Sequence, residues 1–274
     1  MRLKRQRALI VCLLLVLGAA APHRSPAADA SGRITATYRV DLAALHLGDF
    51  NLIASINGTA YEVEANGRFS LLAGMLYRAS GRTMSEGELS KAGPQPAKFT
   101  VSFDNGKKKE RRELRFRGGA VQDISIVPKK KRRADRYVPV TDAQLRHVLD
   151  PLTAAFLHTR WGGAPGDARI CQQTVPVFDG KQRFDIVLQP KRTETLGERA
   201  PLPGPVAVCK VKYVPISGHK PDHSGVKFVT ENEDIEVWLV AVPRTALYIP
   251  YRVVMPTAWG TGSVTLTEIR VGAN

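Results

Sequence analysis

The sequence predicts a mainly β protein whose strands pair antiparallel. Apolar and polar residues alternate in many short segments, and turn residues such as Asn-Gly and Asp-Gly separate these segments. Only one stretch, near the middle of the chain, has helical spacing. Because strands and helices do not alternate regularly, a parallel sheet with crossover helices is not expected.

The first strands are expected over 34–40, 50–56 and 61–65, where every second residue is apolar. A period of two is typical of strands that bury one face. The dipeptide Asn57-Gly58 lies between the second and third segments and predicts a tight hairpin turn.

A second hairpin is expected around 104–106, where Asp-Asn-Gly separates the alternating segment 99–103 from a return strand at 114–116. One more strand follows over 121–127. The apolar segment 69–77 has no clean period, so a short helix and a bent strand both remain open there.

The helical stretch is expected as a short, broken pair of helices packed on the sheet. Thr141 and Gln144 form a capping box, and apolar residues at helical spacing follow them. Asp150 then acts as a new N-cap with Pro151 at the first helical position, and the apolar stripe continues to Phe156. Pro151 breaks the pair because it has no backbone N–H to donate.

The strand pattern resumes at Gln172 and continues to the C-terminus, interrupted by turns such as Asp179-Gly180. In total the sequence predicts about ten to twelve strands. The remaining strands are expected over 184–188, 206–214, 235–242, 247–255 and 263–271.

Residues 1–30 are expected to be a secretory signal peptide. A basic start is followed by an apolar run from Ala8 to Ala21 and by small residues that suit cleavage between Ala20 and Ala30. The alternative is an uncleaved anchor, but this run of about 14 residues is shorter than the roughly 20 that cross a bilayer. Cys12 lies inside the run rather than at its end, which disfavours a lipoprotein.

Residues 31–274 are expected to form one soluble β-rich domain of the periplasm, because a chain of this length can bury a large core. Removing residues 1–30 takes away five basic residues and one aspartate, so the formal net charge falls from +15 to +11. In an exported protein this excess favours anionic lipids, lipopolysaccharide or acidic polymers as partners, and not nucleic acid.

Cys171 and Cys209 are the two cysteines that remain after cleavage, and an oxidising compartment favours a disulfide between them. On the loop-entropy model this crosslink stabilises the fold by roughly 4 kcal/mol. A redox-active pair is the alternative, but the chain has no Cys-x-x-Cys motif that would lower a thiol pKa.

No catalytic signature is found, whether a nucleophile elbow, a zinc-binding helix, a phosphate loop or a dinucleotide fingerprint. We therefore expect a protein that is not an enzyme and needs no cofactor. His219, Asp222 and His223 lie close together, and a metal site is conceivable there. We favour a solvated turn instead, because only three ligands are local and Lys220 adds positive charge.

Two basic runs are candidates for binding an anionic surface. One lies at the 104–106 hairpin and the other after the strand at 121–127, so both could lie at one rim of the sheet. Each exposed cation then contributes about 1 kcal/mol near a charged bilayer. A solvated rim is the alternative. The candidate residues are Lys107, Lys108, Lys109, Lys129, Lys130, Lys131, Arg132 and Arg133.

Trp238 and Trp259 are candidates for ligand binding. Large aromatic residues of a β protein usually belong to its core. The alternative is that they line the concave apolar face of a sheet that curves without closing.

Several short motifs occur in a particular order along the chain. They are Tyr38-Arg-Val, Tyr61, Gly67–Tyr77, Leu149-Asp150-Pro151-Leu152, Asp179–Ile186, Cys209 with Tyr213–His219, Glu236-Val-Trp-Leu and Ile249–Arg252. Together they resemble the proteobacterial periplasmic family of domain of unknown function 3108. The resemblance implies a strongly curved antiparallel sheet, a partial barrel or β-spiral, similar to the fold of periplasmic lipoprotein carriers. It transfers no catalytic residue, and the two basic runs lie outside its pattern.

The function that we expect is non-enzymatic support of cell-envelope integrity, with a lipid or acyl chain bound on the concave sheet face. Burial of an acyl chain contributes about 0.8 kcal/mol per CH₂ group, and the basic rim would contact an anionic head group at the membrane periphery. One alternative is an interaction module that binds peptidoglycan, lipopolysaccharide or a protein through its basic surface. A hydrolase of envelope polymers without a familiar motif is another.

Overall fold

The computed structural model describes residues 32–43, 45–71, 77–90, 93–129, 133–159, 164–243 and 245–272. Within these ranges the chain consists mainly of β-strands, as predicted. The expected signal peptide lies outside the described residues. The strands are β1 (Gly32–Leu42), β2 (Leu45–Asn57), β3 (Ala60–Leu71), β4 (Tyr77–Ser90), β5 (Gly93–Asp104), β6 (Lys109–Arg117), β7 (Ala120–Val127), β8 (Leu157–His158), β9 (Gln173–Phe178), β10 (Arg183–Leu196), β11 (Gly204–Ser217), β12 (Glu236–Ala241), β13 (Leu247–Thr257) and β14 (Gly260–Gly272).

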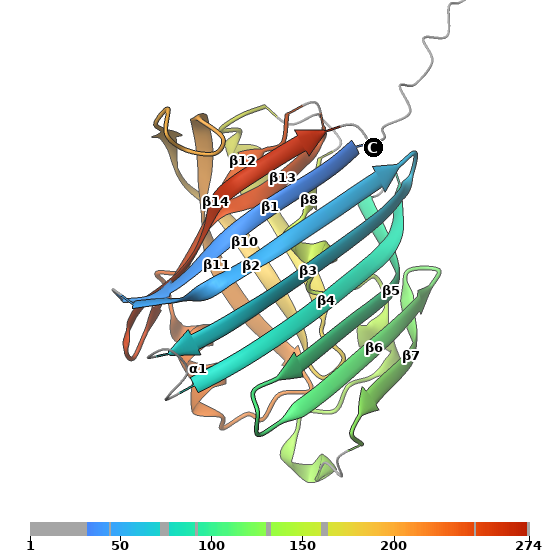
Figure 1. Cartoon of the computed structure of the whole chain (residues 1–274). Coiled ribbons are helices and arrows are strands. Elements are labelled where there is room, and N and C mark those ends of the chain that lie inside the picture. Colours follow the sequence, from blue (N-terminus) through green and yellow to red (C-terminus); the bar gives the residue numbers. More distant parts are fainter. Residues whose placement is uncertain are drawn as a thin grey trace, which may run out of the picture.

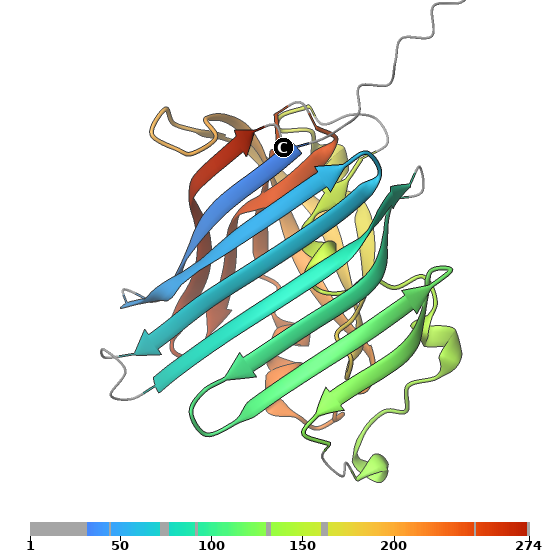
Figure 2. The same ribbon diagram turned by 45° about the vertical axis from the view of Figure 1, so that its right-hand side comes forward.

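All of these strands belong to one antiparallel sheet. Its order is β7-β6-β5-β4-β3-β2-β1-β14-β13-β12-β11-β10-β9, and the short strand β8 pairs with β13. Figures 1 and 2 show β1–β7 as one wall and β9–β13 as a second wall facing it. The two walls are continuous through the pairing of β1 with β14, whereas β7 and β9 form the open edges. The sheet is therefore curved but not closed.

The alternation in the sequence places apolar side chains on the inner face of the first wall. In β2, Leu52, Ala54 and Ile56 are buried, and Leu52 and Ala54 lie opposite Ala36 and Ile34 of β1. The predicted turn after β2 forms, with Gly58 in the left-handed region that favours glycine.

The predicted pair of helices is wrong. The described part of segment 141–156 contains only two short 3-10 turns, η3 (Asp142–Leu145) and η4 (Thr153–Ala155). The capping signal itself is real, since the Thr141 backbone N–H donates to Gln144 Oε1 at 3.1 Å. The chain becomes extended after one turn because residues 146–149 pair with strands instead: Arg146 bridges to Ala120 and Leu149 bridges to Val177.

One α-helix occurs in the described ranges, and the sequence analysis did not predict it. This helix, α1 (Ser224–Glu231), follows the loop after β11. Two further 3-10 turns are η2 (Ala134–Arg136) and η5 (Ala168–Cys171). No helix in the described ranges is long and apolar enough to cross a bilayer.

The core consists of two clusters of buried side chains. The first, which we call the inner cluster, joins both walls, with Ile34 and Leu52 from one and Val206, Val240 and Ile249 from the other. The second, which we call the disulfide cluster, contains Cys171, Cys209 and apolar residues of β9–β13.

Candidate functional site

Residues 148–158 pack inside the curved sheet, and we call this segment the plug. Val148 and Leu152 are buried in the inner cluster, and Phe156 packs against it. At its end, Leu157 pairs with Tyr248 of β13. The plug therefore contacts both walls and occupies part of the space between them.

Asp150 anchors the plug. Its Oδ1 accepts hydrogen bonds from the backbone N–H groups of Leu152 at 2.9 Å and Thr153 at 3.0 Å. Its Oδ2 accepts from Ser85 Oγ at 2.8 Å and from Thr153 Oγ1 at 2.6 Å. Burial raises the pKa of Asp150, although these four donors oppose the shift.

Tyr61 completes this polar centre. Its hydroxyl lies 3.0 Å from Thr153 Oγ1, which lies 2.8 Å from Ser85 Oγ. Burial raises the pKa of Tyr61 to about 12. The carboxylate and the hydroxyl groups bind one another, so this centre fixes the plug to β3 and β4 and presents no free group to a ligand.

An apolar cavity of about 440 Å³ lies beside the plug. This volume falls within the range of small-molecule pockets, which is roughly 300–1,000 Å³. Strands of both walls and the plug contribute to the lining, so the cavity lies within the curve of the sheet and is open on one side. Among the lining residues are Phe50, Leu52, Phe69, Val101, Phe103, Leu152, Phe156, Ile249 and Val264.

A pair of glycines leaves room for the cavity. Gly67 of β3 lies directly opposite Gly81 of β4, and both line the cavity. A Cβ atom on Gly67 would lie 2.7 Å from Phe50 Cβ, whereas a Cβ on Gly81 would have one neighbour within 4 Å, Ser102 O at 3.5 Å. Gly67 thus permits the close approach of Phe50, and Gly81 faces open space.

Tyr38 and Phe50 form a rigid part of the lining. Their rings stack with centroids 4.8 Å apart and an interplanar angle of 8°. The Tyr38 hydroxyl donates to Pro250 O at 2.9 Å, which links β1 to β13 across the interior. Burial raises the pKa of Tyr38, so its hydroxyl stays protonated and keeps this hydrogen bond.

A second hollow, of about 650 Å³, lies beside the open edge of the sheet, and we call it the basic cleft. Ile124, Ile126 and Pro128 contribute apolar surface to it, and cations of four separate segments surround them. Glu110 is the acidic residue of the lining. The cationic lining residues are Lys108, Lys129, Arg133, Arg136, Lys181 and Lys220.

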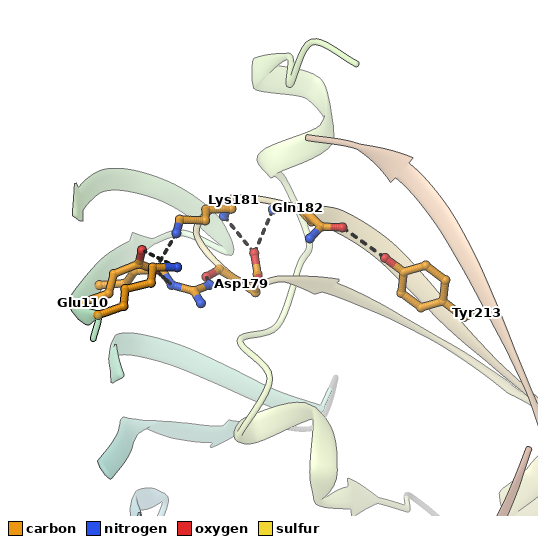
Figure 3. A network of polar contacts seen from close by, with 7 residues as sticks. Glu110, Asp179, Lys181, Gln182 and Tyr213 are labelled. Carbon is orange, nitrogen blue, oxygen red and sulfur yellow. Dashed lines mark hydrogen bonds and ion pairs between the residues drawn. The ribbon is translucent and has the colours of Figure 1, made fainter. Parts of the chain in front are cut away.

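Glu110 of β6 joins the first wall to the β9–β10 turn, as Figure 3 shows. Its carboxylate contacts Lys181 of the β9–β10 turn, and Arg112 Nε lies 3.1 Å from Glu110 Oε1. Arg112 Nη1 in turn donates to Asp179 Oδ2 at 2.9 Å. Desolvation opposes ionisation of Glu110, but the Lys181 ammonium and the nearby cations outweigh it and lower its pKa. The Glu110 charge is therefore already balanced within the protein.

The predicted disulfide forms between Cys171 and Cys209. Both cysteines are fully buried in the disulfide cluster. The bond joins η5 to β11 and crosslinks positions 38 residues apart.

The two basic runs lie at the same end of the sheet, as the sequence analysis considered. Lys108 and Lys129 line the basic cleft together with Arg133. Lys109 instead pairs with Asp104 at 2.9 Å, and Lys107 is exposed in the β5–β6 turn. The remaining candidates, Lys130, Lys131 and Arg132, lie outside the described residues.

Neither tryptophan is among the residues that line the apolar cavity. Trp238 is half-buried, its Nε1 donates to Glu236 Oε2 at 3.1 Å, and the Arg192 guanidinium lies 5.3 Å from its ring centroid. Trp259 lies in the β13–β14 turn and is 80% exposed. The exposure of Trp259 gives no support to its predicted role in a pocket.

The His219–His223 loop has local structural roles. His219 O accepts from Val138 N at 3.0 Å, and the His223 side chain caps α1 by accepting from Gly225 N at 3.2 Å. Asp222 pairs with Lys227 at 3.5 Å. In the described part of the chain no group of three or more His, Cys, Asp or Glu residues is arranged to hold a metal ion.

Sequence reasoning missed most residues of the cavity. The inward positions of β4 are small, with Ala79, Gly81, Thr83 and Ser85 opposite inward residues of β3. Strands were predicted from large apolar residues at every second position. Because the inward residues of β4 are small, this pattern is weak there and β4 was not predicted as a strand. One usable signal was the spacing of these small residues at every second position.

Comparisons with known proteins identify a family. No curated protein matches this chain. The structure is similar to a β-barrel-like protein of domain of unknown function DUF1849 from Brucella abortus, with 8% sequence identity and a TM-score of 0.47, covering 88% of this chain and 98% of that chain. The model of the family DUF3108, described as a protein of unknown function, matches residues 37–267. The chain therefore belongs to the DUF3108 family.

Proposed function

We propose that this protein is a non-enzymatic binding protein of the periplasm that supports the cell envelope and holds an acyl chain in its apolar cavity. The observation that carries the proposal is the cavity itself, which is lined mainly by apolar side chains from both walls and the plug. An apolar group that leaves water for such a lining gains about 0.8 kcal/mol per CH₂ group.

The charged groove nearest the cavity lies on the other face of the sheet. This groove, of about 980 Å³, shares Gly67, Gly81 and Phe103 with the cavity. Its cations Lys109 and Arg111 lie opposite Asp104 and Ser102, which alternate along β5 with the inward Phe103. The proposal therefore rests on the acyl chain alone and gives its head group no contact with these two cations.

The test is a substitution that fills the cavity. Gly81→Val adds a side chain where the backbone allows it, and valine suits a strand. Gly272→Val in β14 is the matched control, because a Cβ there has no neighbour within 4 Å and Gly272 does not line the cavity.

We expect the unmodified chain to bind a dansyl-labelled undecanoic acid, with a rise in dansyl fluorescence, and to carry lipid in native mass spectra. Gly81→Val should weaken probe binding about tenfold, which corresponds to about 1.4 kcal/mol, and Gly272→Val should bind normally. If the unmodified chain binds neither probe nor lipid, or if Gly81→Val binds as well as the control, the proposal is wrong.

A further inference from the structure

β7 has an outer edge that is free along most of its length. On one side it pairs with β6. On the other side, Ala120 bridges to Arg146 and Gly119 O accepts from His147 N at 2.6 Å. In the described ranges, residues 121–127 form no backbone hydrogen bond to any segment except β6. A free strand edge is a template on which another extended segment can pair.

The gap beside β7 already admits extended chain at one end. Residues 146–149 leave the β7 edge and reach β9, where Leu149 N donates to Pro176 O at 2.8 Å and Leu149 O accepts from Phe178 N at 2.9 Å. The chain then turns inward as the plug. Towards the other end, the β9–β10 turn contacts β6, the neighbour of β7, where Arg112 Nη1 donates to the backbone O and to the side chain of Asp179.

The chemistry beside this edge selects the occupant. Six cations of the basic cleft lie beside the β7 edge; Lys181 and Lys108 pair with Glu110, Arg133 forms an exposed pair with Asp135, and Lys129, Arg136 and Lys220 add further positive charge. Ile124 and Ile126 lie on the side of β7 that faces the cleft, and Ile124 is 40% exposed. An added strand that alternates acidic and apolar side chains would match both features.

We infer that the β7 edge and the basic cleft form a docking site for an extended acidic peptide segment of a protein partner, which pairs as an additional strand beside β7. A phosphate-bearing ligand would use the cations but would leave the free backbone edge and the exposed isoleucines without a role. This interaction site is separate from the apolar cavity, and its failure would leave acyl-chain binding untouched.

The experiment uses a synthetic peptide of alternating glutamate and valine, about nine residues long, which is within the usual range of strand lengths and spans β7. A second peptide has the same sequence with N-methyl groups on alternate residues, which removes the donors of one edge and keeps the charge. Inorganic pyrophosphate is the third probe. Binding to the full chain is measured by calorimetry, and protection of the β7 amides by hydrogen exchange.

Two double variants with equal charge change accompany the probes. Lys129→Glu with Arg136→Glu alters the basic cleft. Arg117→Glu with Arg199→Glu is the control. Arg117 is the last residue of β6, and Arg199 lies in the β10–β11 turn, so each is at the other end of its strand from the cleft residues Lys108 and Lys181.

We expect the unmodified peptide to bind and to protect the amides of residues 121–127, with at least about tenfold weaker binding for the methylated peptide. The cleft variant should bind the unmodified peptide about tenfold more weakly, and the control variant should bind it normally. Absence of peptide binding, equal binding of the methylated peptide, or binding without protection of β7 would each overturn the inference. Tight pyrophosphate binding without peptide binding would show a simple anion site instead.

Discussion

The two core clusters of this sheet differ in how they are stabilised. The disulfide cluster is filled with apolar side chains and carries the crosslink between Cys171 and Cys209. The inner cluster instead borders the apolar cavity, and its members Val148 and Leu152 lie on either side of Asp150, a buried carboxyl group held by hydroxyl and backbone donors. The crosslink and the apolar cavity therefore lie in different parts of one continuous sheet. A disulfide stabilises one part, and a polar anchor holds the plug beside the apolar cavity.

Removing the crosslink should have the largest effect. Replacing Cys171 and Cys209 by serine is expected to lower the free energy of unfolding by about 4 kcal/mol, because the unfolded chain regains the entropy of a long loop. Urea unfolding measures this loss. Hydrogen exchange should accelerate more in β9–β12 than in β2–β5. Equal acceleration in both would contradict the comparison and show one cooperative unit.

The paired glycines test the inner cluster. Gly67→Ala should destabilise the fold by about 1–3 kcal/mol, because its Cβ meets Phe50 Cβ at 2.7 Å and the packing has to shift. Gly81→Ala, directly opposite, should be neutral or slightly stabilising, because its Cβ makes only an ordinary contact with Ser102 O at 3.5 Å. Thermal unfolding of the two single variants compares them. Equal losses would mean that the space beside Gly81 is not open.

The pH dependence of stability should have opposite signs at two carboxyl groups. The Arg192 guanidinium lowers the pKa of Glu236 to about 2 from 4.5, so its contribution is present above pH 4.5 and is lost as the pH falls towards 2. Burial raises the pKa of Asp150 above 3.8, so its ionisation makes the fold less stable as the pH rises past that value.

Two neutral variants separate these contributions. Relative to the unmodified chain, Glu236→Gln should lose about 1 kcal/mol of unfolding free energy at neutral pH, since solvent screens this partly exposed pair, and a smaller amount at about pH 3. For Asp150→Asn, the loss of unfolding free energy relative to the unmodified chain should be smaller at neutral pH than at about pH 3, because only the unmodified chain is destabilised by ionisation of Asp150. Urea unfolding at the two pH values gives both differences. Parallel pH profiles for the two variants would contradict the assignment.

Much of the fold could be predicted from local pattern. Strands whose inward residues are large and apolar, such as β2 with Leu52 and Ile56, were recognised because a period of two survives without knowledge of partners. β4 was missed because its inward residues are small. These residues are small because the plug and the cavity occupy the space next to β4; Ser85, for example, donates a hydrogen bond to Asp150 of the plug. Local sequence carries no sign of which distant segment will occupy that space.

Sequence by itself determined the mainly β class, the hairpin turns and the pairing of the two cysteines, because these depend on neighbouring residues or on simple counting. Tertiary structure decided the rest. The helical signals at Thr141 and Asp150 yielded to strand pairing at residues 146–149, since backbone groups beside an open sheet edge gain more from that pairing than from a short helix. The cavity exists because strand register places Gly67 opposite Gly81, and register depends on the whole sheet.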